Sequence, residues 1–501
     1  MVVLNNIYKI FGTLLVFLIF VSTAALSTPL IDHGQLRNSL EKTLHRPLTI
    51  HGGWPQIYDS AYEDFALNMA IDKKDNIIVT GYSFQGSFTN TYTIKYDSSG
   101  NEIWSVSYDS GTHDVGFYLA VDSSNNIYIF GYSGRLPVSD GDCFIVKYSS
   151  EGIEQWNYTF GYGECDYPGG IAVDEDDNII VTGGSGNWQT NMYYWAIKFD
   201  ENCIEQWNDT FHESSIDLGL GVEVDSENNI ITTGFSAVPF SEYVFIIKYA
   251  ENGTKIWEKR RPGSEPWDIA IDSQDSMIIT GTHYSGQSLT MFTIKCDREG
   301  TLLWTAEYDS GVYDGGRSVA VDSNDNIIVG GFSGYSIYDN FEHCAVVYDP
   351  NGNELCLKRE GVQGYIYGVG VDSEDSVYIT GGIEEGIYGY YTTKYTDLIP
   401  PVIKFKIPKE QFLHIFSIPL LPLPKRTIAI GKLNIELQSE DPEDIDYVEL
   451  YIDKQLIKTF TNTPYEWKWD NSTFGMHSIK AIVYDDSGCA AESEISIIKI
   501  F

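Results

Sequence analysis

Residues 172–183 read AVDEDDNIIVTG, and residues 70–81 read AIDKKDNIIVTG. In both stretches an apolar residue and an Asp precede a short polar turn and an apolar run that ends in Thr-Gly. The Asp recurs at steps of 50, 52, 51, 47, 50 and 50 residues. Its seven positions are Asp72, Asp122, Asp174, Asp225, Asp272, Asp322 and Asp372. A period near 50 residues, built from short β-type runs, is typical of the blades of a β-propeller.

Each repeat holds four strand-like runs rich in β-branched and aromatic residues, separated by Gly, Asn, Asp and Ser. We therefore expect one four-stranded blade per repeat. The fourth run carries a tryptophan in five repeats, at Trp104, Trp156, Trp207, Trp257 and Trp304. A large aromatic residue that recurs at one blade position is expected to be a packing residue, substantially buried between neighbouring blades.

The two ends of the repeat region complement each other. The seventh repeat stops at residues 391–395 and has no tryptophan strand after it, whereas residues 54–60 read WPQIYDS and match the run that starts at Trp104. We expect residues 54–59 to pair with 391–395 as the outer strand of the last blade, which removes an exposed edge. The fold class is thus all-β, with a seven-bladed propeller over residues 50–396 that closes by strand exchange.

Loop lengths separate the two faces of this propeller. The turn after the repeat Asp and the turn before the tryptophan strand have constant lengths, while the other connections vary. Variable loops on a rigid scaffold are where binding usually occurs. The predicted ligand-binding residues on the variable-loop face are Trp188, Trp267, Tyr284 and Tyr338. Their rings could stack on sugars or pack against a partner protein; the alternative is that they pack between blades.

The ends of the chain indicate export and a second domain. Residues 10–21 are apolar, follow Lys9, and precede small residues at 22–27. This pattern predicts a signal peptide over residues 1–27, or an uncleaved N-terminal anchor, followed by a linker over 28–49. Residues 397–501 hold alternating strand-like runs between turns, which favours an immunoglobulin-like (Ig-like) β-sandwich. We expect an extracellular or cell-surface protein.

Charge and cysteine content exclude several functions. The 501 residues include 71 acidic and 32 basic ones, for a net charge of −39, so binding to nucleic acid or to an anionic membrane is not expected. The repeated Asp turns lack the alternating oxygen ligands of a calcium loop, and Asx turns explain them without a metal. Calcium binding stays open as the less favoured interpretation, and no other metal or cofactor is expected. Seven cysteines at unrelated repeat positions predict neither a disulfide framework nor a zinc site, but small buried hydrophobic residues.

The repeats resemble the SBBP-type β-propeller repeat, through the pattern of residues 172–183 that recurs across residues 50–396. The tail is similar to the bacterial-type Ig-like modules of exported prokaryotic proteins, through residues 448–453, 464–467 and 474–480. These resemblances imply an exported surface protein. They carry over no catalytic residue, because the repeat family shares none.

Two function classes remain. The first is a secreted or surface-displayed binding or adhesion protein without catalytic activity, with the propeller as recognition head for a protein or glycan and the Ig-like module as spacer. The second is an extracellular propeller enzyme, such as a quinoprotein-like oxidoreductase, a lyase or a glycosidase. Residues 97–104 (DSSGNEIW) are similar to the tryptophan-docking motif of quinoproteins and to the sialidase Asp-box, but the spacings differ by one residue. A central cluster of His, Arg and Asp would favour the enzyme, and an aromatic loop face would favour binding.

Overall fold

The structure is a computed structural model, and it describes two compact units. Among the described residues, one unit is formed by those of 54–345, 349–352 and 359–395, and the other by those of 346–348, 353–358 and 398–500. The described residues are 54–500 except for 61–62, 86–87, 136–140, 164, 188–190, 239–240, 263–264, 286–287, 312, 337–338, 384–388, 396–397, 399–400, 424–425, 440–444 and 486–488. Every regular element in this described part is a β-strand.

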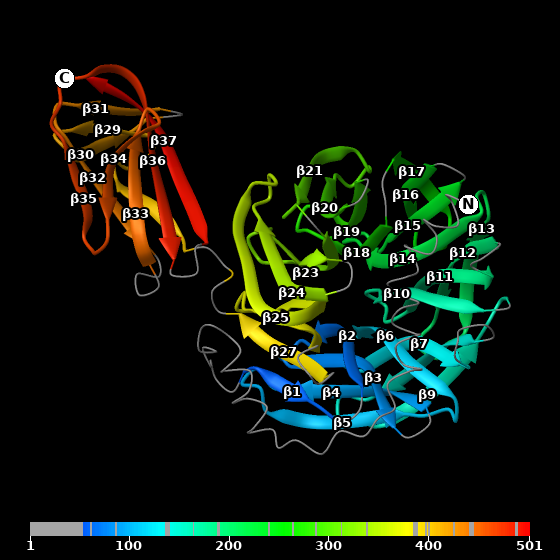
Figure 1. Ribbon diagram of the computed structural model, residues 1–501. Coiled ribbons are helices and arrows are strands. Elements are labelled where there is room, and N and C mark those ends of the chain that lie inside the picture. Colours follow the sequence, from blue (N-terminus) through cyan, green and yellow to red (C-terminus); the bar gives the residue numbers. More distant parts are fainter. Residues whose placement is uncertain are drawn as a thin grey trace. The chain divides into compact units, whose positions relative to one another are not determined.

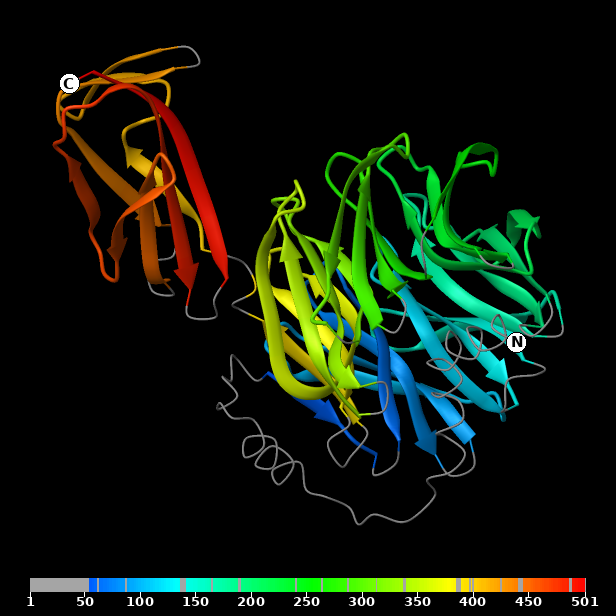
Figure 2. The same ribbon diagram turned by 45° about the horizontal axis from the view of Figure 1, so that its top comes forward.

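The strands of the first unit, coloured from blue to yellow in Figure 1 and Figure 2, pair in groups of four, one group per sequence repeat. Two groups are separate four-stranded sheets, and the others are joined into an 8-stranded and an 11-stranded sheet, in part by the parallel pairs β12–β14 and β20–β22. The first three groups are β2 (Asp64–Ile71), β3 (Ile77–Gln85), β4 (Phe88–Tyr96) and β5 (Glu102–Tyr108); β6 (His113–Val121), β7 (Ile127–Gly134), β8 (Asp142–Tyr148) and β9 (Glu154–Phe160); and β10 (Asp166–Val173), β11 (Ile179–Asn187), β12 (Asn191–Phe199) and β13 (Glu205–Phe211). The next two are β14 (Ile216–Val224), β15 (Ile230–Val238), β16 (Ser241–Tyr249) and β17 (Lys255–Pro262); and β18 (Glu265–Ile271), β19 (Met277–Ser285), β20 (Ser288–Cys296) and β21 (Leu302–Tyr308).

The last two groups share one long strand. The sixth comprises β22 (Tyr313–Val321), β23 (Ile327–Ser336), β24 (Asp339–Tyr348) and the start of β25 (Glu354–Val371). The seventh comprises the rest of β25, then β26 (Val377–Ile383), β27 (Gly389–Tyr395) and β1 (Gln56–Tyr58). Ile57 of β1 lies opposite Tyr391 of β27, so a strand from the start of the repeat region supplies the outer strand of the last group, as the sequence predicts.

The turn after each repeat Asp is fixed by that residue's own side chain. In the first repeat, Asp72 Oδ1 accepts hydrogen bonds from the backbone N–H groups of Lys74 and Asn76, at 2.8 and 3.0 Å. Asp75 adopts a left-handed φ of 59°, which Asp and Asn tolerate better than most residues. The corresponding residue of every repeat is Asp or Asn with a φ between 58° and 63°. This is the Asx turn that the sequence predicts.

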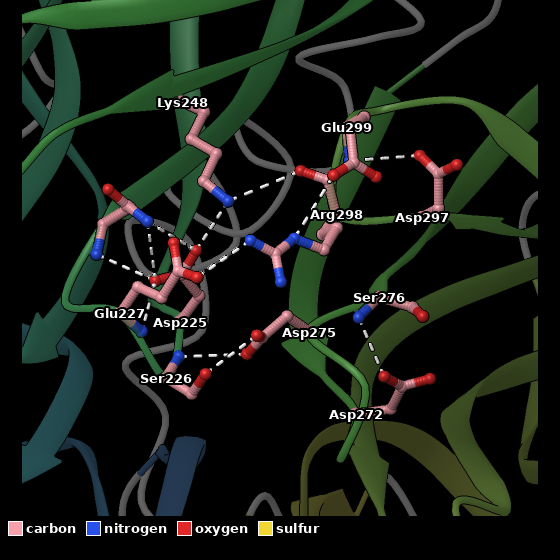
Figure 3. Close-up of polar contacts among 11 residues, drawn as sticks. Asp225, Ser226, Glu227, Lys248, Asp272, Asp275, Ser276, Asp297, Arg298 and Glu299 are labelled. Atoms are coloured by element: carbon pink, nitrogen blue, oxygen red, sulfur yellow. Dashed lines mark hydrogen bonds and ion pairs between the residues drawn. The ribbon is translucent and has the colours of Figure 1, made fainter.

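The left-handed residue of each turn also joins two neighbouring repeats. Its side-chain oxygen accepts a hydrogen bond from a backbone N–H in the turn of another repeat; Figure 3 shows Ser226 and Asp275, beside the Lys248–Asp225 ion pair. The seven donor–acceptor pairs are Lys73 with Asn125, Ser123 with Asp177, Glu175 with Asn228, Ser226 with Asp275, Ser273 with Asp325, Ser323 with Asp375, and Ser373 with Asp75. The series returns to its first turn after seven steps.

A lysine on the third strand of six repeats forms an ion pair with the repeat Asp. The pairs are Lys95–Asp72, Lys147–Asp122, Lys198–Asp174, Lys248–Asp225, Lys295–Asp272 and Lys394–Asp372, at 2.6–3.7 Å. Burial acts to raise the pKa of Asp72, but hydrogen bonds from Asn76, Lys95 and the turn lower it below its ordinary value. The sixth repeat has Val347 at the lysine position, and there burial raises the pKa of Asp322.

The repeated tryptophans pack against the turn of the next repeat, as expected of packing residues. Trp207 Nε1 donates a hydrogen bond to the Glu251 carbonyl at 3.0 Å, and a Cβ added to Gly253 would lie 2.7 Å from the Trp207 ring. Trp104 and Trp304 donate in the same way. The five tryptophans are half-buried, less than we expected, because the strands that carry them leave alternate residues exposed to solvent. Trp54, beside β1, is 1% exposed.

The second unit is a two-sheet sandwich. One sheet has the order β28 (Ile403–Ile407), β32 (Leu433–Ser439), β35 (Tyr465–Trp469). The other has the order β30 (Ile418–Pro422), β29 (Phe412–Ile415), β31 (Thr427–Ile430), β37 (Ala490–Ile500), β36 (Phe474–Asp485), β33 (Ile445–Ile452), β34 (Gln455–Phe460). Alternate residues of both sheets, such as Ile435, Leu450 and Val483, form one buried core, which matches an Ig-like sandwich.

The cysteines differ from the sequence prediction. Cys356 and Cys489, 133 residues apart, form a disulfide. The sequence predicts no disulfide framework, and this single bond was not anticipated, because folding brings together two cysteines that no local spacing relates. Cys203 is half-buried, and the remaining four are buried as expected: Cys143, Cys165, Cys296 and Cys344. In the described part of the chain, no helix is long and apolar enough to cross a membrane.

Candidate ligand-binding site

The first strands of the repeats lie innermost in the first unit. Successive first strands from β2 to β22 contact one another, and Figure 1 shows β2, β6, β10, β14 and β18 around a common centre. Each first strand has a β-bulge five residues before the repeat Asp. The seven bulged residues are Leu67, Phe117, Gly169, Leu220, Trp267, Arg317 and Tyr367. A bulge re-aims a side chain and often adjoins a functional site.

Arg317 is the charged residue of this set, and it lies among aromatic rings. Its guanidinium carbon is 4.1 Å from the centre of the Trp267 ring, 5.5 Å from Phe332 and 6.0 Å from Tyr367. Its Nε is buried without a hydrogen-bond partner. None of the hydrogen bonds and ion pairs among the described residues involves this guanidinium. The direct contacts of this charge among the described residues are therefore cation–π contacts.

Buried polar atoms without partners lie on β18 and β19, two strands that contact the strand of Arg317, β22. They are Glu265 Oε1, Trp267 Nε1 and Thr282 Oγ1. Glu265 and Thr282 lie directly opposite each other on β18 and β19. Glu265 is 3% exposed, and burial raises the pKa of its carboxyl to about 8, although Arg317 acts to lower it. Burial also raises the pKa of the half-buried Tyr284. We call Glu265, Trp267, Thr282, Tyr284 and Arg317 the axial cluster.

Two further carboxyl groups lie on the inner strands next to this cluster. Asp268 accepts hydrogen bonds from Ser318 Oγ and from the Val319 N–H, both at 2.9 Å, so it ties β18 to β22. Burial raises the pKa of Asp268 to about 6. Burial, with a smaller contribution from the charge of Asp268, raises the pKa of Glu223 to about 8. The inner strands thus hold several carboxyl groups with raised pKa values, which are more common at functional sites than elsewhere.

The structure brings two of the four predicted binding residues together. Trp267 and Tyr284 pack against the same apolar cluster, which includes Leu220. Both lie in strands, β18 and β19, so their placement in variable loops is wrong: the strands extend further toward that face than loop lengths indicate. Trp188 and Tyr338 lie outside the described residues.

Sequence reasoning did not identify Arg317 or Glu265. The signal for Arg317 is present once the repeats are aligned on the Asp, because Arg317 stands five residues before it, as Trp267 does in the preceding repeat. A charged residue at a position that is otherwise apolar, aromatic or Gly is informative. The bulge that gives this position its role was not visible in the sequence.

The opposite, constant-turn face is occupied by contacts within the chain. Figure 3 shows Arg298 paired with Glu227 at 2.8 Å and with Glu299 at 3.2 Å, close to the turn of Asp275. A search of the described residues finds no group of three or more His, Cys, Asp or Glu side chains that could hold a metal ion.

Several known proteins are similar to parts of this chain. Residues 421–481 match the family model of the bacterial Ig domain. A stretch of 117 residues is 28% identical to an uncharacterized WD repeat-containing protein of Acanthamoeba polyphaga mimivirus; the match covers 19% of this chain and 8% of that protein. Among solved structures, the Dos1 propeller has a TM-score of 0.44 at 10% identity, covering 67% of this chain and 94% of its own. The β-propeller domain of the Trilobed protease from Pyrococcus furiosus has a TM-score of 0.41 at 8% identity, covering 67% and 96%. The match over residues 421–481 agrees with the two-sheet sandwich of the second unit, and all regular elements of the described residues are β-strands.

Proposed function

We propose that this chain is an exported, non-catalytic binding protein, in which the propeller holds the ligand and the Ig-like module is a spacer. On this proposal the seven strand groups are SBBP-type blades of one ring, and β1 closes the ring in the last blade. The pairing of Ile57 with Tyr391 and the seven-step series of turn hydrogen bonds support this ring. The ring provides a rigid support for the inner strands that carry the axial cluster.

The observation that carries the binding proposal is the set of unpartnered polar atoms in the axial cluster. Glu265 Oε1, Trp267 Nε1, Thr282 Oγ1 and Arg317 Nε are all buried without hydrogen-bond partners. Native proteins leave few buried polar groups unsatisfied, because each costs about 1–3 kcal/mol. A ligand, or water that a ligand displaces, would satisfy these groups. The half-buried rings of Trp267 and Tyr284 add contact area for a glycan or for a side chain of a partner protein.

Two features support export. The apolar stretch at residues 10–21 has the composition of a signal segment, and disulfides such as Cys356–Cys489 persist mainly in oxidising compartments. The bacterial Ig domain match fits an extracellular location.

In protein recovered from an export compartment, thiol titration under denaturing, non-reducing conditions should find five reactive thiols, since two of the seven cysteines are bonded. Seven thiols would contradict this assignment.

Binding is tested with the purified full chain on a glycan array and against extracellular protein fractions. We expect binding to be lost in Trp267→Ala and in Tyr284→Ala, with melting temperatures that show both variants folded. Tyr158→Ala is the matched control, because Tyr158 is an exposed aromatic residue on the outer strand β9. Trp188→Ala and Tyr338→Ala test the other two predicted residues. Normal binding by both axial variants would overturn this site.

One observation favours the enzyme as a second candidate. Glu265 and Asp268 have pKa values raised to about 8 and about 6, and carboxyl groups with separated pKa values can divide acid and base roles. A glycosidase or lyase would use such a pair. Incubation of the full chain with any glycan it binds should leave that glycan intact. Product formation that is lost in Glu265→Gln would instead establish the enzyme.

A further inference from the structure

Arg317 holds a positive charge that the described protein does not neutralise. Its guanidinium stacks on Trp267 at 4.1 Å, and no ion pair among the described residues involves it. Arg298 on the constant-turn face differs from Arg317, because its guanidinium forms ion pairs with Glu227 and Glu299. The side chain of Arg317 is half-buried. A planar guanidinium held by an aromatic ring, with free N–H groups, is suited to bind a carboxylate or phosphate through two parallel hydrogen bonds.

The polar atoms next to Arg317 are mostly donors. Trp267 Nε1 can only donate, and Thr282 Oγ1 can donate or accept. Glu265 would be mainly protonated at neutral pH, because its pKa is raised to about 8, so it too can donate. A group in which every member can donate matches a ligand rich in acceptor oxygens.

The nearby carboxyl groups could instead attract a cation, and the contacts decide against this. Asp268 already accepts hydrogen bonds from Ser318 and Val319 at 2.9 Å, so its oxygens are engaged on the inner strands. Glu223, like Glu265, has a pKa raised to about 8 and carries little charge at neutral pH. The unpaired charge that remains in the axial cluster is that of Arg317.

We propose that Arg317 binds the carboxylate of a ring-shaped acidic ligand such as a uronic acid sugar, with Trp267, Thr282 and Glu265 donating hydrogen bonds to its oxygens. The proposal rests on the proposed binding function and names the chemical class of its ligand. The half-buried ring of Tyr284 provides an aromatic surface for the ligand ring. A non-sugar organic acid carries the same carboxylate. The experiment therefore compares uronic acid sugars with acetate.

The test is calorimetric titration of the purified full chain with D-galacturonate, D-glucuronate, D-galactose, D-glucose and acetate. We expect at least one uronate to bind about 10-fold or more tightly than its neutral sugar, and more tightly than acetate. Arg317→Met should weaken uronate binding by about 10-fold or more, as a lost charge-assisted hydrogen bond predicts. Arg317→Lys should recover only part of it, because an ammonium cannot form the two parallel bonds.

An arginine outside the axial cluster provides the matched control. Arg298→Met removes an arginine of the opposite face and should bind as the wild type does. The proposal is overturned if neutral sugars bind as tightly as uronates, if acetate alone accounts for the affinity, if no uronate binds, or if folded Arg317→Met binds normally. Neutral glycans that bind and are lost in Trp267→Ala would overturn the carboxylate inference while leaving the proposed binding function intact.

Discussion

Ser373 and Asp75 join the last turn of the repeat region to the first, across 298 residues of sequence. The backbone N–H and the hydroxyl of Ser373 donate to the two carboxylate oxygens of Asp75, at 2.9 and 2.8 Å. Ser323 makes the same two contacts with Asp375 between neighbouring repeats, at 2.9 and 2.6 Å. The contact that closes the series therefore has the same geometry as the contacts within it.

Replacing Asp75 should weaken this contact between the first and last turns. Asp75→Ala removes both acceptors from a residue with a φ of 59°, and we expect a loss of about 1–3 kcal/mol in the free energy of unfolding. Asp75→Asn should cost less, because Asn keeps one acceptor oxygen and stands at this position in two other repeats, as Asn125 and Asn228. Denaturant unfolding measures both. Equal stability of the wild type and Asp75→Ala would show that the contact contributes nothing.

The packing of Trp207 on Gly253 gives a second prediction, with a control in the same chain. Both Gly253 and Gly111 have positive φ, at 82° and 89°. A Cβ at Gly253 would lie 2.7 Å from the Trp207 ring, whereas a Cβ at Gly111 would meet nothing within 4 Å. Gly111→Ala should lower the free energy of unfolding by about 1–2 kcal/mol, because alanine disfavours the left-handed backbone conformation. Gly253→Ala should lower it by about 1–3 kcal/mol more, because the new Cβ also overpacks against the Trp207 ring. Thermal unfolding compares them, and equal losses would exclude a tight Trp–Gly contact.

The ion pair between Lys95 and Asp72 predicts a pH-dependent effect. Both side chains are buried, and their charged atoms are 2.7 Å apart. Lys95→Met should lower the free energy of unfolding at pH 7 by about 3–5 kcal/mol, because it leaves an unpaired buried carboxylate. The folded pKa of Asp72 lies below its ordinary value. The stabilisation from the pair is therefore present above that ordinary value and is lost as the pH falls through the folded pKa.

The difference between wild type and Lys95→Met should thus shrink in acid. Lys74→Met is the control, because Lys74 is exposed in the same turn and should change stability little at any pH. A difference that stayed constant from neutral to acidic pH would show that the effect of Lys95→Met comes from packing and not from charge.

Local chemistry explains which parts of the fold were predictable. The Asp72 turn needs an Asx residue at its start and a residue that tolerates a positive φ at Asp75, so the sequence repeats these residues and shows the period. The pairing of residues 54–59 with the last repeat followed from a missing strand. Burial of the tryptophans was overestimated, because sequence does not show that their strand lies outermost. The Cys356–Cys489 disulfide joins positions that no spacing connects.

The site was less predictable, for a physical reason. Trp267 and Tyr284 were identified as aromatic residues near the variable-loop face, but their partners were not. Arg317 occurs in an ordinary strand sequence, and a one-residue bulge turns it toward Trp267. Whether a charged residue is paired or free depends on contacts between different strand groups, which loop lengths and composition do not reveal.

Glu265 gives the last prediction, on stability as a function of pH. Burial raises the pKa of its carboxyl from 4.5 to about 8 in the folded state, so the folded protein holds this proton more tightly than the unfolded chain does. The contribution of Glu265 to stability is therefore fully present below about pH 4.5 and is lost as the pH rises through about 8. Glu265→Gln removes the ionisable group, and should be more stable than the wild type at pH 9 by on the order of a few kcal/mol. The two should be nearly equal at pH 4.

Urea unfolding at several pH values measures this difference. The groups that face Glu265 are Arg317, Glu242 and Tyr284, and Glu223 and Asp268 titrate in the same range, so only the difference between variant and wild type reports on Glu265. Glu102→Gln, an exposed residue on β5, is the control and should show no such pH dependence. The stability of Glu265→Gln relative to the wild type could instead fall with rising pH. Glu265 would then be ionised and paired in the folded protein, with Arg317 as its partner instead of a free cation.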